Sequence, residues 1–329
     1  MPPFSGMPYG AAPGWFFPTA ELMLYALLIV CLIHAMRRGS GAVVYLSGGF
    51  VFGLILEYFE VVSRSYTYGR FYVMLGHAPL DIPLCIGAGW AIILYSSRLF
   101  TDVQRLPILG AAALDTLLAL NIDLSMDVVA YRLHMWHWHW EGTRFDPLHA
   151  QWFGVPYGNF VGWATVVFCY SFFSRLFERR LARRNDLRER NSVARSAMVA
   201  VLALLASQAV LALTEVYIFG WMSRHLGITS ALRLSLIVAT LLVLAIAGWR
   251  KRKLPAGQIP AIATWMPCWF HLFFISCFFG FGFYRENRWM TVIACTNVIL
   301  GLTIHLVPLR RKLADKSTSP IQSLQAEQA

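Results

Sequence analysis

Five carboxylic acids lie inside apolar stretches of the sequence, where a charged side chain is costly. They are Glu57, Glu60, Asp115, Asp123 and Asp127. A carboxylate at the centre of a bilayer costs about 2.5–3.5 kcal/mol, so five of them facing lipid would cost on the order of 12 kcal/mol. They must therefore face a protein interior or a wet cavity. There a carboxyl group can donate or accept a proton, and we take all five as candidate catalytic residues.

The spacing of these acids places them in pairs on helical faces. Glu57 and Glu60 are three residues apart and Asp123 and Asp127 are four apart, so each pair shares one face of a helix. Asp115 precedes the second pair by two turns and lies about 80° around the helix from Asp123. In such a crowded pair one carboxyl group can stay protonated near neutral pH while its neighbour is ionised. The alternative is a set of structural ion pairs with three arginines: Arg64, Arg70 and Arg132.

A run of alternating tryptophan and histidine follows the second pair of acids. On a strand, this alternation puts tryptophan on one side and histidine on the other. We predict that Trp136 and Trp138 bind substrate, and anchoring at the membrane interface is the alternative for each. The histidines are His134, His137 and His139. Metal binding by them is the weaker interpretation, and we predict no metal ligand.

A polar segment opens the next apolar stretch. It reads Tyr157-Gly158-Asn159-Phe160-Val161-Gly162-Trp163. We expect Tyr157, Asn159 and Trp163 to contact substrate, because the amide of Asn159 lies at the depth of the outer ends of the acidic helices. A helix N-cap is the alternative for the asparagine. The two glycines, four residues apart, predict a close approach of another helix.

Membrane-spanning helices must position these residues. Of the 329 residues, 57% are hydrophobic and 14% charged, against about 45–50% apolar and about 25% charged residues in soluble proteins. This composition argues against a soluble enzyme, a disordered chain and a disulfide-stapled secreted domain. We therefore predict an all-α fold, a polytopic membrane helix bundle of nine spans. The apolar runs are Thr19–Met36, Ala42–Val62, Pro83–Tyr95, Leu106–Leu133, Gly158–Phe177, Ala194–Met222, Ser230–Trp249, Ala261–Tyr284 and Trp289–Val307.

The basic residues predict the orientation of these spans. Most of the 28 Lys and Arg residues fall on one side of the nine-span layout, many of them between Arg175 and Arg195. The positive-inside rule then places the N-terminus outside and the C-terminus in the cytoplasm of a multi-pass cell-membrane protein. The net charge of +11 is on this interpretation a topology signal, and we predict no nucleic-acid partner.

The candidate chemistry is concentrated in the first half of the chain. We treat residues 1–313 as one polytopic membrane domain, with a catalytic half at about 19–177 and a scaffold half at about 194–307. The polar tail, residues 314–329, is expected to be disordered.

The same residues resemble the carotenoid biosynthesis protein family, which includes CruF-like and bisanhydrobacterioruberin hydratases. The first part of the resemblance consists of Glu57-Tyr58-Phe59-Glu60, Tyr66-Thr67-Tyr68-Gly69, Leu75-Gly76, Pro83 and Trp90. The second consists of Asp115, Asp123-Leu124-Ser125-Met126-Asp127-Val128-Val129-Ala130, Trp136-His137-Trp138 and the segment from Phe153 to Trp163. It covers about residues 50–165, and the last four helices match nothing known to us.

The resemblance implies a membrane enzyme that adds water across the terminal 1,2 double bond of an acyclic carotenoid and forms a tertiary alcohol. Its partners would be a lipid-soluble polyene or isoprenoid substrate and membrane lipid. A protonated carboxyl group would donate to the less substituted carbon, and an ionised neighbour would deprotonate the attacking water. Aromatic faces would stabilise the carbocation, by about 2 kcal/mol or more when desolvated. No cofactor is expected for this reaction.

Three other functions remain open at this point. In a UbiA-type prenyltransferase, Asp123 and Asp127 would hold Mg²⁺ and a diphosphate. A carotenoid end-group cyclase would use the same protonation step, with an internal alkene in place of water. A lipid or proton transporter would use the intramembrane acids as a proton relay.

Overall fold

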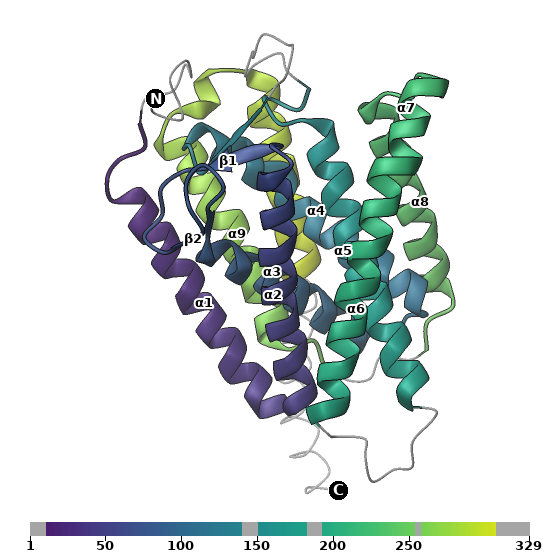
Figure 1. Cartoon of the computed structure of the whole chain (residues 1–329). Coiled ribbons are helices and arrows are strands. Elements are labelled where there is room, and N and C mark those ends of the chain that lie inside the picture. The colour runs from purple at the N-terminus through teal and green to yellow at the C-terminus, as the bar shows by residue number, and fades with distance from the viewer. Residues whose placement is uncertain (1–10, 140–150, 183–192, 254–257, 307–329) are drawn as a thin grey trace, which may run out of the picture.

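The computed structural model describes residues 11–139, 151–182, 193–253 and 258–306. Within these residues nine helical segments are long and apolar enough to cross a membrane, which confirms the predicted all-α membrane bundle (Figure 1). Seven are single helices: α1 (Phe16–Arg38), α2 (Ser40–Val62), α3 (Leu84–Val103), α4 (Ile108–Arg132), α5 (Tyr157–Ala182), α8 (Ser230–Arg250) and α9 (Ala261–Gly280). The last segment is Arg288–Leu306. The predicted tail, residues 314–329, lies outside the described residues.

The remaining span is a composite of three helical pieces. It runs through Val193–Leu226 and consists of α6 (Val193–Leu213), a π-helical segment (Thr214–Phe219) and α7 (Gly220–Leu226). In Figure 1 this span and α8 stand together at one side of the bundle.

Helix α3 is longer than its apolar run predicts. The prediction ended at Tyr95, whereas the helix continues to Val103. The extra turns carry Ser96, Ser97 and Thr101, which the sequence alone marks as a polar end. All three are buried, because the end of α3 packs against α4 and α5 through polar contacts described below.

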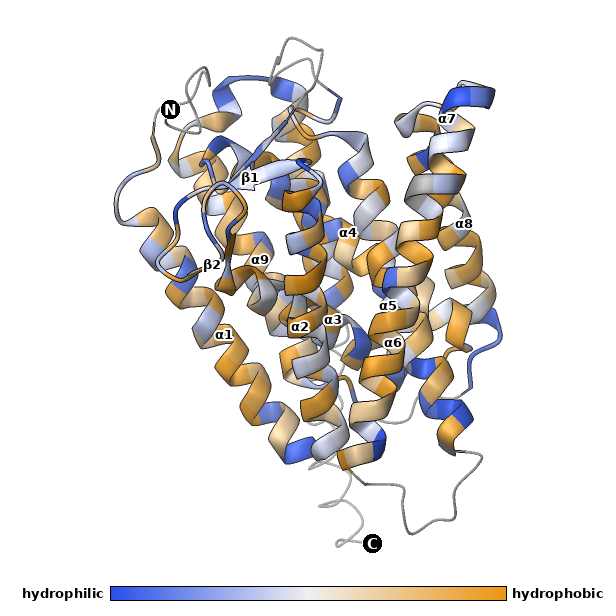
Figure 2. Ribbon diagram, in the orientation of Figure 1, coloured by the Kyte–Doolittle hydropathy of each residue, from blue (hydrophilic) through white to orange (hydrophobic). Residues whose placement is uncertain are grey.

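Apolar side chains face outward on the peripheral helices, as expected for a protein surrounded by lipid. Figure 2 shows hydrophobic residues along the outer sides of α1, α6 and α8. Leu22 of α1 and Val243 of α8 are 66% and 65% exposed. The more buried helices α3 and α4 form the centre of the bundle. Surface and core are therefore both apolar, and polar groups inside the bundle stand out as sites.

A close helix approach between glycines lies elsewhere than predicted. A Cβ added at Gly158 or Gly162 would meet no atom within 4 Å, so these residues do not mark a close helix approach. A Cβ at Gly110 of α4 would instead lie 2.8 Å from the Cα of Gly248 of α8. The prediction failed because each glycine needs a partner helix, and the spacing of glycines on one helix does not specify one.

Two short strand pairs lie at one end of the bundle. Strand β1 (Tyr66–Tyr68), which follows α2, pairs antiparallel with β4 (Trp136–Trp138), which follows α4. Strand β2 (Met74–Leu75) pairs with β3 (Ile82–Pro83) just before α3. The β1–β4 ladder ties the ends of α2 and α4 together, and these ends carry the two predicted pairs of acids. Trp140, the last tryptophan of the alternating run, lies outside the described residues.

The orientation of the bundle remains a prediction and has a direct test. Arg184→Cys and Thr143→Cys place one thiol in each of two predicted loops, both outside the described residues. With the N-terminus outside, an impermeant thiol reagent added to intact cells should label position 143 and leave position 184 unlabelled. Cys295 needs prior replacement, because it is half-buried whereas the other five cysteines are buried. Labelling of position 184 and not of position 143 would show that the orientation is the opposite of the predicted one.

Candidate active site

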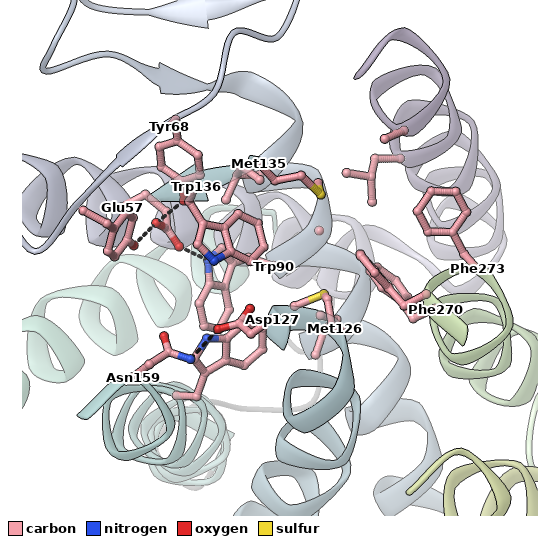
Figure 3. Close-up of a pocket in the computed structure, with 18 of the residues that line it drawn as sticks. Glu57, Tyr68, Trp90, Met126, Asp127, Met135, Trp136, Asn159, Phe270 and Phe273 are labelled. Carbon is pink, nitrogen blue, oxygen red and sulfur yellow. Dashed lines mark hydrogen bonds between the residues drawn. The ribbon is translucent and has the colours of Figure 1, made fainter. Parts of the chain in front are cut away.

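A pocket lies beneath the β1–β4 ladder, with about 700 Å³ of empty space among its lining residues when the part open to the surroundings is included (Figure 3). Helices α1 to α5 and α9 contribute to its wall. Its polar lining residues are Glu57, Tyr66, Tyr68, Asp127 and Asn159. Four tryptophans also line it: Trp90, Trp136, Trp138 and Trp163. The pocket therefore collects six of the ten predicted site residues from four separate elements: Glu57, Asp127, Trp136, Trp138, Asn159 and Trp163.

Glu57 is buried and accepts three hydrogen bonds. The hydroxyl groups of Tyr66 and Tyr68 donate to its Oε2, and Trp90 Nε1 donates to its Oε1 over 2.6 Å. Burial and the charge of Glu57 raise the pKa of both phenols well above the usual value, so they remain protonated donors. Because a neutral carboxyl group must donate one hydrogen bond itself, a shell of three donors fits the ionised form.

Asp123 and Asp127 share one amide donor. Asn159 Nδ2 lies 3.2 Å from Asp123 Oδ2 and 2.5 Å from Asp127 Oδ2. Both aspartates are buried, and no ion pair among the described residues involves either of them. Within the same residues Asp123 Oδ1 has no hydrogen-bond partner. Two adjacent carboxyl groups with no cation cannot both be ionised at low cost, so this pair is suited to hold one proton.

Stacked indole rings connect the two acidic centres. The ring centroids of Trp90 and Trp163 are 4.2 Å apart, with an interplanar angle of 28°. Trp90 donates to Glu57, and Trp163 lies one helical turn after Asn159 on α5. The glutamate on α2 and the asparagine that bridges the aspartates therefore lie on either side of one aromatic stack.

The β1–β4 ladder supplies four further rings. Trp136 and Trp138 are buried and pack edge-to-face on Tyr68 and Tyr66, at centroid distances of 6.2 and 4.7 Å. His137, between the two tryptophans, is half-buried. The predicted alternation is thus present from Trp136 to Trp138, with the tryptophans on the pocket side.

The three pocket residues that donate hydrogen bonds to Glu57 were not predicted as site residues: Tyr66, Tyr68 and Trp90. A signal for the tyrosines was present, because Tyr-Thr-Tyr has the same period of two as Trp-His-Trp and predicts two rings on one side of a strand. Trp90 carried no signal of periodicity, although it is one of the residues that carry the family resemblance. It belongs to an apolar helix, and only the packing of α2 against α3 shows that its indole N–H meets a carboxylate.

Glu60 and Tyr157, both predicted as site residues, do not line the pocket. Glu60, one turn after Glu57 on the same face of α2, is half-buried and is not among the lining residues. Tyr157 donates its backbone N–H to Gln151 Oε1, and its ring is partly buried against the hydrophobic core.

Asp123 does not line the pocket either. It lies one helical turn before Asp127 on α4 and shares with it the amide donor of Asn159, which does line the pocket. The sequence left open that the five acids form structural ion pairs with Arg64, Arg70 and Arg132. Two of these arginines pair with other acids. Arg70 instead pairs with Asp81 at 2.6 Å and Arg132 with Glu286 at 3.0 Å.

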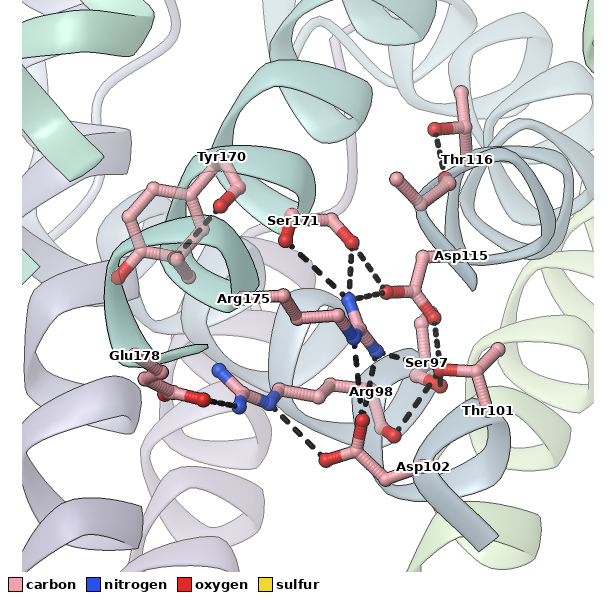
Figure 4. Close-up of polar contacts among 12 residues, drawn as sticks. Ser97, Arg98, Thr101, Asp102, Asp115, Thr116, Tyr170, Ser171, Arg175 and Glu178 are labelled. Carbon is pink, nitrogen blue, oxygen red and sulfur yellow. Dashed lines mark hydrogen bonds and ion pairs between the residues drawn. The ribbon is translucent and has the colours of Figure 1, made fainter. Parts of the chain in front are cut away.

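Asp115 lies in a separate polar cluster toward the other end of the bundle (Figure 4). Its Oδ2 is 2.7 Å from Arg175 Nη1 and accepts from Ser171 Oγ at 2.6 Å, while its Oδ1 accepts from Thr101 Oγ1 at 2.6 Å. Twelve residues of helix separate it from Asp127, or about 18 Å along α4. These contacts satisfy both oxygens of Asp115 within the protein.

The extent of similarity to known proteins decides the family. A model of the carotenoid biosynthesis protein family matches residues 16–234, more than half of the 329 residues. The chain belongs to this family. No curated protein and no solved structure matches the chain. Family membership makes it a multi-pass membrane protein of carotenoid biosynthesis, which implies a lipid-soluble isoprenoid substrate in contact with membrane lipid.

The family match is longer than the motifs predicted. The resemblance in the motifs covered about residues 50–165, whereas the match begins at the start of α1 and ends within α8. It therefore includes every pocket residue except those of α9. Helix α9, in the half expected to act as scaffold, contributes Phe270, Phe273 and Phe274 to the pocket wall.

The tyrosines that hold Glu57 give the first prediction for the site. Tyr66→Phe and Tyr68→Phe each remove one donor from a buried carboxylate, at a cost of about 1.5–3 kcal/mol. If this cost falls on the transition state, each variant should lose about tenfold or more in turnover. Tyr25→Phe is the matched control, because Tyr25 donates to Glu21 outside the pocket. Equal turnover in Tyr66→Phe, Tyr68→Phe and Tyr25→Phe would show that the hydroxyl groups of Tyr66 and Tyr68 do not contribute to the reaction.

Proposed function

We propose that the protein hydrates the terminal double bond of an acyclic carotenoid, as a hydro-lyase using carboxyl groups as acid and base. The observation that carries the proposal is the pairing of two unlike acidic centres across one pocket. Glu57 has three hydrogen-bond donors, and the aspartate pair shares a single amide. Such a difference in environment is how one site keeps a proton donor and a proton acceptor side by side.

Protonation is the first step of the proposed reaction. Asp127, the member of the pair that lines the pocket, donates its proton to the less substituted carbon of the terminal alkene. The π electrons form the new C–H bond, and a tertiary carbocation remains on the neighbouring carbon. The faces of Trp136, Trp138 and Trp163 stabilise this charge, and a cation–π contact shielded from bulk solvent is worth about 2 kcal/mol.

Water addition completes the reaction. A water molecule forms a C–O bond to the cationic carbon and loses a proton to Glu57, which yields the tertiary alcohol. The proton then passes from Glu57 to the ionised aspartate pair and restores the starting state. One water is consumed and no electron is transferred. Asp123 and Asn159 act as positioning residues. Asn159 donates its amide N–H to Asp127, and Asp123 shares that amide and the single proton of the aspartate pair.

Pigment mass is the test of this proposal. We expect expression of the chain in a lycopene-producing bacterium to raise the mass of the pigment by about 18 for each end group hydrated, the mass of one water. Cells that express the Asp127→Asn variant at equal amounts are the control and should retain lycopene. An unchanged mass with altered retention would instead indicate cyclisation, and a larger increase would indicate prenyl transfer. Either result would overturn the hydration proposal.

A further inference from the structure

The pocket has two chemically distinct ends. Figure 3 shows Glu57 and Asn159 on one side and Phe270 and Phe273 of α9 on the other. The lining residues that α1 and α9 contribute are Ala20, Met23, Leu24, Phe270, Phe273 and Phe274. None of these side chains is charged or forms strong hydrogen bonds. This end of the pocket is therefore suited to a hydrocarbon.

Two residues connect the apolar end of the pocket with the outer surface. Met23 of α1 and Phe273 of α9 line the pocket and are nevertheless only half-buried. Their chain neighbours Leu22 and Leu272 are 66% and 46% exposed on the apolar surfaces of the same helices. The apolar end of the pocket thus lies directly beside two lipid-facing surfaces.

The packing around α3 explains why the two helices do not seal this end. Both α1 and α9 pack on α3, which forms the back wall of the pocket. A Cβ at Gly89 of α3 would meet no atom within 4 Å, so the wall is hollow at this point. Near the start of α1, Phe16 stacks on Phe273 with ring centroids 6.2 Å apart. The two helices therefore meet through Phe16 and Phe273, and the pocket begins directly beside this contact, where Phe273 and Met23 line it.

We propose that the pocket opens to the bilayer between α1 and α9 and takes an acyclic isoprenoid end first, with its tail against Met23 and Phe273. The inference rests on the proposed function for the identity of the reacting end. The reacting end of the isoprenoid must contact Asp127 and Glu57. Its hydrocarbon tail then lies at the apolar end of the pocket, where apolar side chains take the place of the lipid that surrounded it. A route through lipid also avoids exposing the chain to water, which costs about 0.8 kcal/mol per methylene.

Obstruction of the opening tests the route by pigment binding, without reliance on the reaction. The protein is expressed in a lycopene-producing bacterium and purified in detergent, and the pigment retained per protein is measured after extraction. Met23→Trp enlarges a side chain at the opening and should lower retained pigment about tenfold, because the tail loses its place against α1. Leu22→Trp adds the same ring to the adjacent lipid-facing position and should retain pigment at the wild-type level.

The opposite side of the opening provides an independent pair of variants. Phe273→Trp should lower retained pigment as Met23→Trp does, and Leu272→Trp is its matched control on α9. This pair decides the question if Met23→Trp does not accumulate. Wild-type retention in Phe273→Trp, or equal losses in a variant and its control, would overturn the proposed route. Pigment mass in the same extracts reports on hydration separately, so unchanged mass with the expected losses would refute hydration and support the route.

Discussion

Asp127→Asn and Glu57→Gln should each abolish hydration while the protein still folds. An amide preserves the size of each side chain and removes its ability to donate or accept a proton. General acid–base catalysis contributes about 10²–10⁴-fold to a rate, so turnover should fall by at least that range. Product formation in membranes, with protein amounts equalised by immunoblot, measures the effect. Asp123→Asn should also lose activity, because Asp123 shares the amide of Asn159 with Asp127.

Glu60→Gln is the matched control for Glu57→Gln. Both replacements remove one carboxylate from the same face of α2, three residues apart, but only Glu57 lines the pocket. We therefore expect Glu60→Gln to keep near-normal turnover. If Glu57→Gln is as active as Glu60→Gln, and Asp127→Asn retains activity as well, the carboxyl groups of the pocket do not carry acid–base catalysis.

Asp115→Asn should destabilise the protein and leave the chemistry of its folded fraction unchanged. The replacement removes the buried charge that faces Arg175, whose guanidinium also contacts Thr101 and Asp102. Breaking a buried ion pair costs about 3–5 kcal/mol when the remaining charge has no other partner. Because Asp102 stays 3.0 Å from Arg175, the loss should be smaller than this. Thermal unfolding in detergent and the amount of folded protein in membranes measure the loss.

The control for this prediction is an ion pair of similar chemistry whose basic partner is exposed. Asp81→Asn breaks the pair with Arg70, whose side chain is 75% exposed whereas that of Asp81 is 9% exposed, so the charge left without its partner stays in contact with solvent. Exposed pairs contribute about 0–1 kcal/mol, so this variant should unfold close to the wild-type temperature. The double replacement Asp115→Leu with Arg175→Met should recover part of the stability, because it removes both charges. A stable Asp115→Asn protein with no turnover would instead assign Asp115 to catalysis.

The sequence by itself determined the features that depend on neighbours along the chain. Nine spans follow from runs of apolar residues, because lipid selects for helices whose side chains are apolar over about 20 residues. The alternation of Trp136 and Trp138 with His137 fixed which rings share a side of β4. Residue types and spacing were also sufficient to identify the family, since the motifs that carry the resemblance can be read directly along the chain.

Only the tertiary structure decided which acids share a site. Helical spacing shows that Glu57 and Glu60 lie on one face of α2. Only Glu57 lines the pocket, because the pocket lies beneath the β1–β4 ladder, which joins the ends of α2 and α4 beside Glu57. Asp115 finds its partner Arg175 sixty residues later in the chain, on α5. Periodicity describes one helix at a time, whereas the pairing of faces depends on packing between helices. That packing separates five similar carboxyl groups into three sets: Glu57, Asp123 and Asp127 at the pocket, Asp115 beside Arg175, and Glu60 outside both.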